Sequence, residues 1–308
     1  GGPAAHWRRP PIQSVWRHAC EAPIRLMALI DLHLHTTASD GRCSPAELIA
    51  RAANAGIGVL SVTDHDTRAA HDEARAAAEA RGIVFIPGIE ITSVHRGKNV
   101  HLLAYGLPGA ASELDGFLAQ QRASRTTRAL GIADKLAALG APISKEALLE
   151  MAHTRTGKAL ARPQIADLLV QAGHATSVSD AFDRYIGEQC AAYVPHTGAS
   201  PADVVALVDR LGGVASLAHP GQLASDELIP GLVAHGLHAI EVFHSSHDAA
   251  ATAHYASLAA RLGVAMTGGS DYHGEGTRRA DAFGTVGLPL EQFERLQLLL
   301  TRTKRPAH

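Results

Sequence analysis

The sequence predicts an α/β fold in which a parallel sheet or barrel is interrupted by a helical subdomain. Short apolar runs rich in β-branched residues alternate with alanine-rich helical patterns near both ends of the chain. Repeated strand-then-helix units are typical of parallel sheets and barrels. Between them, residues 107–192 contain only helical patterns. We therefore expect this block to be an inserted cap that lies over the sheet and reads the substrate.

The expected elements follow one another in a regular order. The first strand is predicted at 28–35, and a helix begins after it at Ser44-Pro45, because serine caps a helix well and proline suits its first turn. Further strands are expected at 59–63, 83–87, 100–105, 214–218, 239–243 and 264–267. Further helices are expected at 69–80, 112–139, 144–152, 162–172, 178–186, 201–211, 248–262 and 290–301.

The domain organisation follows from this order. A chain of 308 residues is long enough for a sizeable core. Residues 27–106 and 193–308 are predicted to form one barrel domain, with 107–192 as the insertion. Residues 1–26 contain arginine and proline but lack the apolar core of a signal peptide, so we expect a disordered extension. Met27 has the position of a natural start.

Composition excludes several classes of protein. The chain is 46% hydrophobic with a formal net charge of −2, so overall charge predicts neither nucleic-acid nor membrane binding. Its apolar runs fall short of the roughly 18–20 residues that a membrane span needs. Cys20, Cys43 and Cys190 are far apart, which argues against a disulfide framework or a thiolate metal site and favours a reducing cytoplasm. The 19 histidines are an excess that suggests a metal site.

The first predicted strand ends in two histidines. In ALIDLHLHTTASDG, residues 28–41, His33 and His35 close an apolar run, and Asp40 follows five residues later. Because residues i and i+2 of a strand point to one face, both rings are expected to project together, as ligands of one ion would. Comparable residues lie at or near other predicted strand ends: His65, Glu90, His101, His219, Asp271 and His273. Active sites of α/β barrels lie at the carboxyl ends of the strands.

Each of these residues also has an ordinary explanation when taken alone. His65 is flanked by Asp64 and Asp66 and would fit a turn. Asp271 would serve as a helix cap, and His219 would fit a turn. Taken together, they favour a metal site, because a shared cation removes the cost of burying unpaired imidazoles and carboxylates. The set contains no sulfur, which suits manganese, iron or zinc.

Five motifs in combination, DLHLHTTASDG, TDHDT, PGIEI, HPG and GSDYH, resemble the PHP (polymerase and histidinol phosphatase) family of metal-dependent phosphoesterases. The resemblance covers about residues 28–106 and 193–275. It implies a distorted seven-stranded (β/α) barrel with a trinuclear site. One ion would take His33, His35, Glu90 and Asp271, a second would share Glu90 and add His101 and His219, and a third would take Asp40, His65 and His273.

This implied centre would hold two to three divalent ions, with manganese favoured and iron or zinc as alternatives. Two ions that share Glu90 would lie about 3.5–4 Å apart and would lower the pKa of bound water from about 15.7 toward roughly 7. The resulting hydroxide would attack phosphorus, while the third ion would neutralise charge on a phosphoryl oxygen. His219, His273 and Asp271 are the predicted catalytic residues, and either histidine is a candidate donor of the proton to the leaving oxygen.

The long helix predicted at 112–139 carries unusual arginines. Arg125 and Arg128 lie on its apolar stripe, and Lys135 lies at the edge of that stripe. One explanation is that these side chains snorkel or pair with acids on the barrel. We favour the other, that they enter the cleft and bind a second phosphate of the substrate. Arg162 is a further substrate-binding candidate, and Lys158 and His196 are secondary ones.

The insertion narrows the expected activity. Its segments QQRASRTTRA and ARPQIA resemble the branch of the family that contains 3′,5′-nucleoside bisphosphate phosphatases and RNase AM. The resemblance predicts a phosphatase that removes the 3′-phosphate from a small nucleotide substrate and leaves a 5′-nucleotide. The same site would suit 5′→3′ exonuclease action on short single-stranded RNA.

Two alternatives stay open. One is a phosphatase of the histidinol-phosphate type, and the other is a non-catalytic PHP metal-binding module. No membrane and no obligate protein partner are expected. The remaining histidines considered are expected to be surface or structural: His71, His153, His174, His238, His244, His247 and His254.

Overall fold

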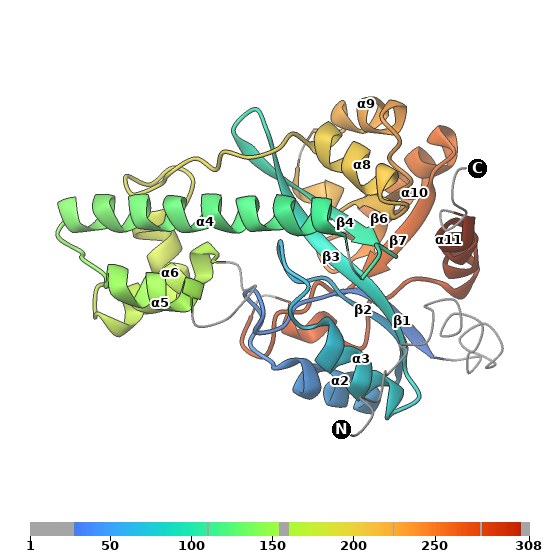
Figure 1. Ribbon diagram of the computed structural model, residues 1–308, viewed down its shortest axis with the longest axis horizontal. Coiled ribbons are helices and arrows are strands. Elements are labelled where there is room, and N and C mark those ends of the chain that lie inside the picture. Colours follow the sequence, from blue (N-terminus) through green and yellow to red (C-terminus); the bar gives the residue numbers. More distant parts are fainter. Residues whose placement is uncertain (1–27, 110, 154–159, 224, 278, 303–308) are drawn as a thin grey trace, which may run out of the picture.

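The structure is a computed structural model, which describes residues 28–302 apart from 110, 154–159, 224 and 278 (Figure 1). The extension predicted at 1–26 and the secondary candidate Lys158 therefore lie outside the described residues. In the described part of the chain, no helix is both long enough and apolar enough to cross a membrane.

A single seven-stranded sheet forms the centre of the molecule, and its strands neighbour one another in sequence order. The strands are β1 (Leu29–Leu34), β2 (Ile57–Val62), β3 (Val84–His95), β4 (Lys98–Tyr105), β5 (Val214–Leu217), β6 (Ala239–His244) and β7 (Ala265–Gly269).

The first and last strands meet and nearly close the sheet into a barrel. Ser270 donates from its backbone N–H and from Oγ to the buried carboxylate of Asp31, at 3.0 and 2.6 Å. The backbone N–H of Asp271 donates to the carbonyl of His33 at 2.8 Å. The predicted barrel fold is confirmed. Closure of the barrel brings the residues of β1 next to those that follow β7.

Strand β3 extends beyond the predicted 83–87 and forms a hairpin with β4. Arg96 and Gly97 connect the two strands with φ angles of 49° and 78°, and positive φ at both positions of a two-residue turn suits the twist of a hairpin. The β3–β4 and β4–β5 pairs are antiparallel, so the expected parallel pairing is wrong there. As a result, Glu90 and His101 lie within strands rather than at strand ends.

Helices cover the outside of the barrel on two sides (Figure 1). The helices α2 (Pro45–Asn54) and α3 (His71–Glu79) lie beside the first strands. Helix α8 (Pro201–Arg210) packs against β3, β4 and β5, α9 (Leu228–Ala234) lies beside α8, and α10 (Ala249–Leu262) packs against β6 and β7. Ser44 accepts a hydrogen bond from the backbone N–H of Glu47, whose side chain reaches back to the backbone of Ser44. The predicted helix start is confirmed.

The barrel interior is apolar at one end. Leu32, Ile86 and Leu103 fill it from three different strands, together with Phe293 and Leu296 of the final helix, α11 (Leu290–Arg302). This packing closes one mouth of the barrel and leaves the other mouth for polar side chains.

The insertion consists of the long helix α4 (Ser112–Ala138), then α5 (Lys145–His153), α6 (Arg162–Gln171), α7 (Val178–Ala181) and a π-helical turn (Phe182–Ile186). Leu114 and Leu118 of α4 pack in the barrel core, whereas Ile132 and Leu136 belong to a separate core of the insertion. Helix α4 therefore extends from the barrel to the other helices of the insertion (Figure 1).

Candidate metal centre

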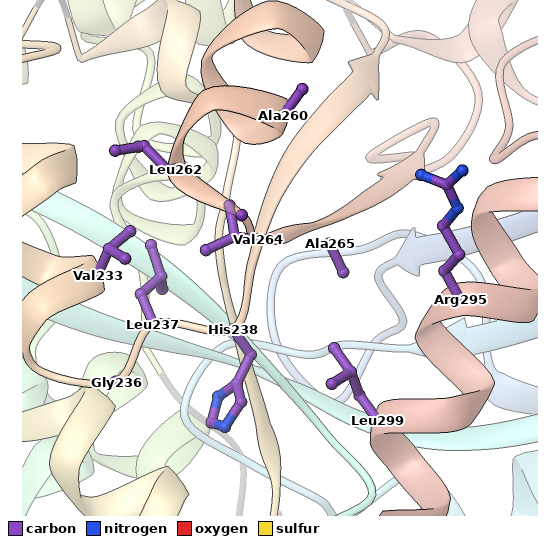
Figure 2. A pocket seen from close by; sticks show the side chains of 11 residues that line it. Val233, Gly236, Leu237, His238, Ala260, Leu262, Val264, Ala265, Arg295 and Leu299 are labelled. Atoms are coloured by element: carbon purple, nitrogen blue, oxygen red, sulfur yellow. The ribbon is translucent and has the colours of Figure 1, made fainter.

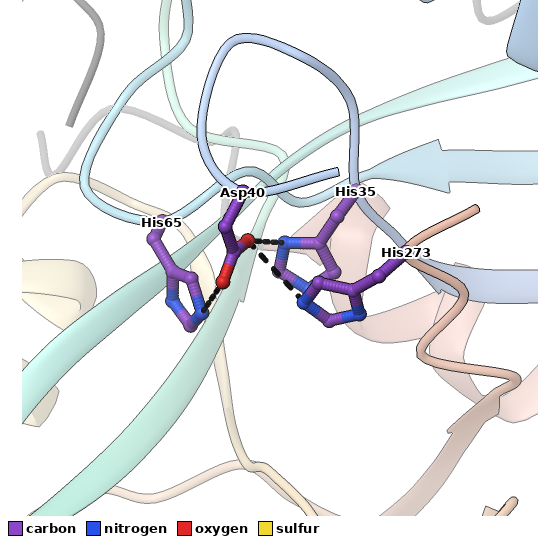
Figure 3. A group of neighbouring side chains, drawn as sticks. All are labelled: His35, Asp40, His65 and His273. Carbon is purple, nitrogen blue, oxygen red and sulfur yellow. Dashed lines mark ion pairs between the residues drawn. The ribbon is translucent and has the colours of Figure 1, made fainter. Parts of the chain in front are cut away.

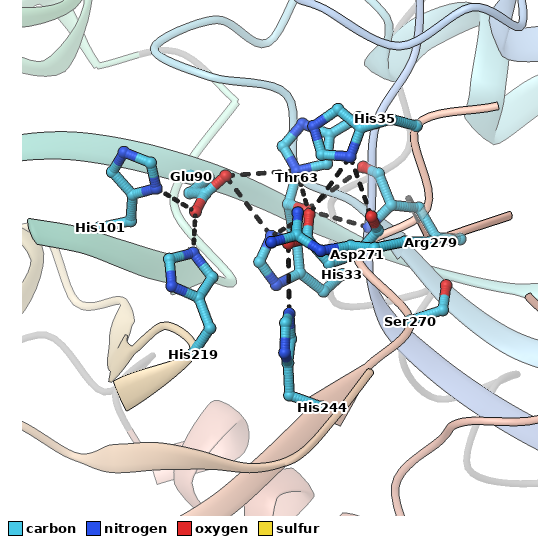
Figure 4. A network of polar contacts seen from close by, with 12 residues as sticks. His33, His35, Thr63, Glu90, His101, His219, His244, Ser270, Asp271 and Arg279 are labelled. Carbon is cyan, nitrogen blue, oxygen red and sulfur yellow. Dashed lines mark hydrogen bonds and ion pairs between the residues drawn. The ribbon is translucent and has the colours of Figure 1, made fainter. Parts of the chain in front are cut away.

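His33 and His35 project together at the end of β1, as the HxH spacing predicts, and both are fully buried. Their Nε2 atoms face the same two carboxylates (Figure 4). Nε2 of His33 lies 3.4 Å from Oε2 of Glu90, and Nε2 of His35 lies 3.2 Å from the same oxygen. They also lie 3.4 and 3.3 Å from Oδ1 of Asp271. Four side chains thus converge on one point, as the predicted first ion requires.

Glu90 uses its other oxygen for a second group of ligands. Oε1 lies 2.9 Å from Nδ1 of His101 and 3.1 Å from Nε2 of His219. The nearly buried Glu90 therefore stands between two sets of imidazoles, as a bridging carboxylate does (Figure 4). The ring of His65 also approaches it, with Nδ1 3.1 Å from Oε2.

Asp40 is the centre of a third group (Figure 3). Its Oδ1 lies 3.3 Å from Nε2 of His273 and 3.6 Å from Nδ1 of His35, and its Oδ2 lies 3.7 Å from Nε2 of His65. The donor atoms of these four residues all lie within 4.8 Å of one another. Asp40, His65 and His273 therefore come together as predicted, and His35 lies beside them.

Two independent observations indicate that these residues could bind divalent cations. Nε2 of His33 and Nε2 of His35 are buried without a hydrogen-bond partner in the described structure, and buried polar atoms rarely stay unpaired. The donors are imidazole nitrogens and carboxylate oxygens, a set that suits manganese, iron or zinc. The candidate ligands are thus arranged for cations rather than for a closed network of hydrogen bonds.

The electrostatics of the centre also favour cations. Burial would raise the pKa of Glu90, but the imidazoles of His65 and His101 outweigh it and hold the pKa well below its usual value. Burial would lower the pKa of His35, but the nearby carboxylates of Asp271 and Glu90 outweigh it and raise the pKa to about 10. The carboxylates are therefore ionised, and they create a strong preference for positive charge at the points where the rings meet them.

Two of the ligands have an unusual backbone. His219 and Asp271 adopt φ angles of 30° and 54°, in the left-handed region that non-glycine residues rarely occupy. Both follow the ends of barrel strands, β5 and β7. Such conformations are common at functional sites, where the surrounding structure compensates their cost.

The predicted substrate-binding residue Arg125 is buried against the barrel. Its Nε donates to Oδ2 of Asp66 at 2.6 Å, and its Nη2 donates to Thr92. This contact is the pairing with a barrel acid that we considered as the alternative. Lys135 lies further along α4, where its exposed Nζ donates to the carbonyl of Tyr193 at 2.6 Å. The role of both residues in substrate binding stays a prediction.

Arg128 and Arg162 meet beside an aromatic ring. Their guanidinium carbons lie 5.5 and 5.7 Å from the centre of the Tyr193 ring. Nη2 of Arg128 and both ring nitrogens of His196 are buried, and none of them has a hydrogen-bond partner among the described residues. We call these four residues, Arg128, Arg162, Tyr193 and His196, the cationic cluster.

One cavity of the described structure contains none of the candidate ligands. It has a volume of about 690 Å³, and Leu237, His238, Val264 and Arg295 are among the residues that line it (Figure 2). Three of these precede β6 and β7, so the cavity opens at the opposite end of the barrel from the ligands.

Comparisons with known proteins agree with this geometry. The profile of the PHP domain matches residues 31–157. The 5′-3′ exoribonuclease Rnm of Salmonella typhimurium is 34% identical over 252 residues, which cover 80% of this chain and 85% of that protein. The chain belongs to the PHP family.

Two further relatives have different names. The phosphoribosyl 1,2-cyclic phosphate 1,2-diphosphodiesterase of Eggerthella lenta is 34% identical over 250 residues, which cover 80% of this chain and 94% of that protein. The 3′,5′-nucleoside bisphosphate phosphatase of Chromobacterium violaceum is 33% identical over 268 residues, with coverages of 85% and 93%. This PHP protein is therefore similar, at nearly equal distance, to enzymes that act on different phosphate esters.

A solved structure confirms the fold. A proposed metal-dependent phosphoesterase from Bifidobacterium adolescentis superposes with a TM-score of 0.80 at 31% identity, over 87% of this chain and 95% of that one. The predicted family, fold class and hydrolase character are confirmed for this PHP protein.

Two buried residues of this PHP centre were not predicted. Glu241 had no assigned role, and His244 was grouped with surface or structural histidines. His244 is only 3% exposed, and its Nε2 lies 3.2 Å from Oδ2 of Asp271 (Figure 4). The available signal for Glu241 was a single acid inside an otherwise apolar strand, since a buried, unpaired carboxylate is costly.

Proposed function

We propose that this PHP protein is a metal-dependent phosphatase that hydrolyses the 3′-phosphate of nucleoside 3′,5′-bisphosphates. The products are a 5′-nucleotide and phosphate. One observation carries the proposal: the arginines of the cationic cluster and the candidate ligand His101 all act electrostatically on His196, so the cluster lies within electrostatic reach of a centre built for cations. A substrate with two phosphates matches this pair of sites, because one phosphate would meet the metal centre and the other the guanidinium groups.

Two to three divalent ions, with manganese favoured, would be held by the three groups around Glu90, Asp271 and Asp40. When bound, the ions supply positive charge for the phosphoryl oxygens and lower the pKa of water. The protein positions the phosphorus between the groups and excludes bulk water, since His33, His35 and Glu90 are buried. We assign protonation of the leaving oxygen to His219, which lies against Glu90, or to His273, which lies against Asp40 and Asp271.

The cationic cluster is suited to phosphate because its own contacts leave its charge unneutralised. Within the described part of the chain, the hydrogen bonds recorded for Arg128 and Arg162 go to the carbonyls of Val194 and Ile186. Burial and the nearby charge of Arg162 lower the pKa of Arg128 to about 10. A phosphate dianion would accept bidentate hydrogen bonds there and neutralise both groups.

His196 connects the two sites electrostatically. Burial, together with the charges of the arginines and of His101, lowers its pKa to about 3. Because His101 is a candidate metal ligand, this ring lies within electrostatic reach of both the centre and the cationic cluster. A bound phosphate would accept from the buried Nη2 of Arg128 and from the one ring nitrogen of His196 that carries a proton.

A second activity, 5′→3′ exonuclease action on short RNA, is favoured by the similarity to the Salmonella exoribonuclease. The 5′-terminal phosphate of a strand would occupy the cationic cluster, and the first phosphodiester would lie at the metal centre. The proposed compartment is the cytoplasm, in agreement with the free thiols of Cys43 and Cys190.

The test is phosphate release by the Mn²⁺-loaded protein from adenosine 3′,5′-bisphosphate. Parallel reactions would contain 3′-AMP, histidinol phosphate, phosphoribosyl 1,2-cyclic phosphate and a short 5′-phosphorylated RNA. We expect the highest kcat/KM for the bisphosphate. Preference for histidinol phosphate or the cyclic ester would overturn the proposed substrate, and turnover of none of them would leave a non-catalytic metal-binding module.

A further inference from the structure

Strand β6 supplies none of the predicted ligands, yet it places two polar side chains in the centre. Glu241 is fully buried and His244 nearly so. Each touches a ligand that belongs to a neighbouring strand or to the segment after it. The inference drawn from them rests on the proposed metal-dependent function.

Glu241 contacts two candidate ligands at once. Its Oε1 lies 2.9 Å from Nδ1 of His33, and its Oε2 accepts the backbone N–H of His219 at 2.7 Å. An ionised carboxylate can only accept, so Nδ1 of His33 carries the ring proton. In the neutral ring that a cation requires, Nε2 of His33 then has a free lone pair, and it is this atom that faces Glu90 and Asp271.

His244 contacts the other carboxylate-bearing ligand of this group, Asp271. Its Nδ1 accepts the backbone N–H of Ser246 at 3.0 Å, so the ring proton of the neutral imidazole lies on Nε2. That Nε2 lies 3.2 Å from Oδ2 of Asp271, to which Arg279 also donates. With Oδ2 occupied in this way, the other oxygen, Oδ1, faces the Nε2 atoms of His33 and His35.

An irregularity in β6 allows both side chains to reach the centre. Residues three apart in a regular strand point to opposite faces. The register between β6 and β7 shifts between Glu241 and Phe243, where one extra residue is accommodated. Such bulges redirect side chains near active sites. The bulge requires Gly268, because a Cβ atom there would lie 2.6 Å from Cβ of Phe243.

We propose that Glu241 and His244 are positioning residues for the metal centre. Glu241 fixes the tautomer of His33 and the left-handed backbone of His219, and His244 directs Oδ1 of Asp271 toward the cation. Residues that orient metal ligands in this way typically change metal affinity by 10- to 100-fold when they are replaced.

The decisive variant is Glu241→Gln, which preserves the shape of the side chain. If the amide oxygen accepts from the backbone of His219, the amide N–H₂ must face Nδ1 of His33. That nitrogen then becomes an acceptor, and the ring proton moves to Nε2, where it blocks the cation. His244→Gln tests the second contact independently, so the inference stays testable if either variant fails to fold.

The measurement is Mn²⁺ binding to chelator-treated protein, by calorimetric titration for affinity and elemental analysis for stoichiometry at saturation. We expect the tightest binding step to weaken 10- to 100-fold in each variant, while the number of ions at saturating Mn²⁺ is unchanged. Activity lost at low Mn²⁺ should return at high Mn²⁺. Glu291→Gln and His254→Gln are matched controls on exposed side chains, and they should bind as the unaltered protein does.

Two outcomes would overturn the inference. Unchanged affinity in both variants would show that the contacts do not position the ligands. Loss of one ion even at saturation in His244→Gln would make His244 a ligand, which its distance from His33 and Asp271 would allow. The binding measurement uses no substrate, so weakened Mn²⁺ binding without phosphatase activity would refute the proposed function and leave this inference standing.

Discussion

Arg125 of helix α4 is ion-paired with Asp66, with 2.6 Å between Nε and Oδ2. The pair is almost completely buried, and Asp66 also accepts the backbone N–H of Thr92 at 2.9 Å. Since Asp66 directly follows the candidate ligand His65, this contact fixes the insertion to the loop that carries the metal centre.

Replacing Arg125 should destabilise the protein strongly. Arg125→Met would leave the charge of Asp66 buried and unpaired, which typically costs about 3–5 kcal/mol. Chemical denaturation would measure the loss, and Arg125→Met combined with Asp66→Asn should recover part of it. The control is Arg184→Met, an exposed pair with Asp180 that should cost less than about 1 kcal/mol. If Arg125→Met loses no more unfolding free energy than Arg184→Met, the prediction is contradicted.

The cationic cluster should distinguish substrates by their second phosphate. Arg128→Met removes one charged hydrogen-bond donor, worth about 1.5–3 kcal/mol, so kcat/KM for adenosine 3′,5′-bisphosphate should fall roughly 10- to 100-fold. The same variant should turn over 3′-AMP almost normally, because that substrate lacks the 5′-phosphate. Steady-state kinetics on both substrates would decide, and equal losses would refute a second-phosphate site.

Asp40 should control one ion without removing the others. In Asp40→Ala, the group that contains His65 and His273 loses its carboxylate, whereas the ligands around Glu90 are untouched. We expect one fewer Mn²⁺ per chain and a fall in kcat of about 10²–10³-fold, the usual size for loss of one stabilising charge. Elemental analysis would check the count, with exposed Asp134→Ala as the control. Full metal content in Asp40→Ala would exclude this role.

Metal binding should stabilise the folded chain. Cations that bind only the native state raise its stability by about 2.7 kcal/mol at a concentration one hundred times Kd. Thermal unfolding should therefore shift upward with added Mn²⁺ and return to its original midpoint with excess chelator. Mg²⁺ at equal concentration should have a smaller effect, because imidazole ligands suit manganese better. An unfolding midpoint that is insensitive to Mn²⁺ would argue against the centre.

His71 should make stability depend on pH. Burial lowers its pKa to about 4, and its Nε2 donates to the carbonyl of Gly88 at 2.7 Å. In the unfolded chain the pKa is about 6.5, so the contribution of the neutral ring is fully present above pH 6.5. It should be lost as pH falls from about 6.5 to 4, by up to about 3 kcal/mol.

Denaturation of His71→Gln across this pH range would test the effect, because glutamine keeps a donor for Gly88 and does not titrate. The variant should lose less stability on acidification than the unaltered protein. The exposed His254→Gln should follow the unaltered protein. Parallel curves for all three proteins would show that His71 does not contribute.

The sequence alone predicted those metal ligands that lie close to one another along the chain. His33 and His35 share a face because strand geometry alone places them there, and Asp40 returns to them within one short loop. The β3–β4 hairpin was not predicted, although Arg96-Gly97 lies at its turn, because the apolar runs at 83–87 and 100–105 do not include the polar residues that extend both strands to the turn. Helix α9 was missed because it contains Pro230 and Gly231, which disfavour helices.

Sequence patterns could not predict contacts between residues that are far apart in the chain. The partner of Arg125 lies 59 residues away, and helical periodicity shows only that the arginine is on the buried face. Glu241 and His244 are three residues apart, a spacing that predicts opposite faces, and only the register shift against β7 brings them together. Alternation along a strand cannot reveal a bulge that the neighbouring strand creates.

The closure of the barrel has a consequence for how the protein is made. Asp31 and Ser270 are 239 positions apart, and the first group of ligands combines His33 and His35 with Asp271 from the far side of that seam. A ribosome must therefore translate the chain at least through Asp271 before the first ion has its full set of ligands. Until then His33 and His35 lack the carboxylate of Asp271. We therefore expect the metal ions to bind only after this part of the chain has been synthesised and folded.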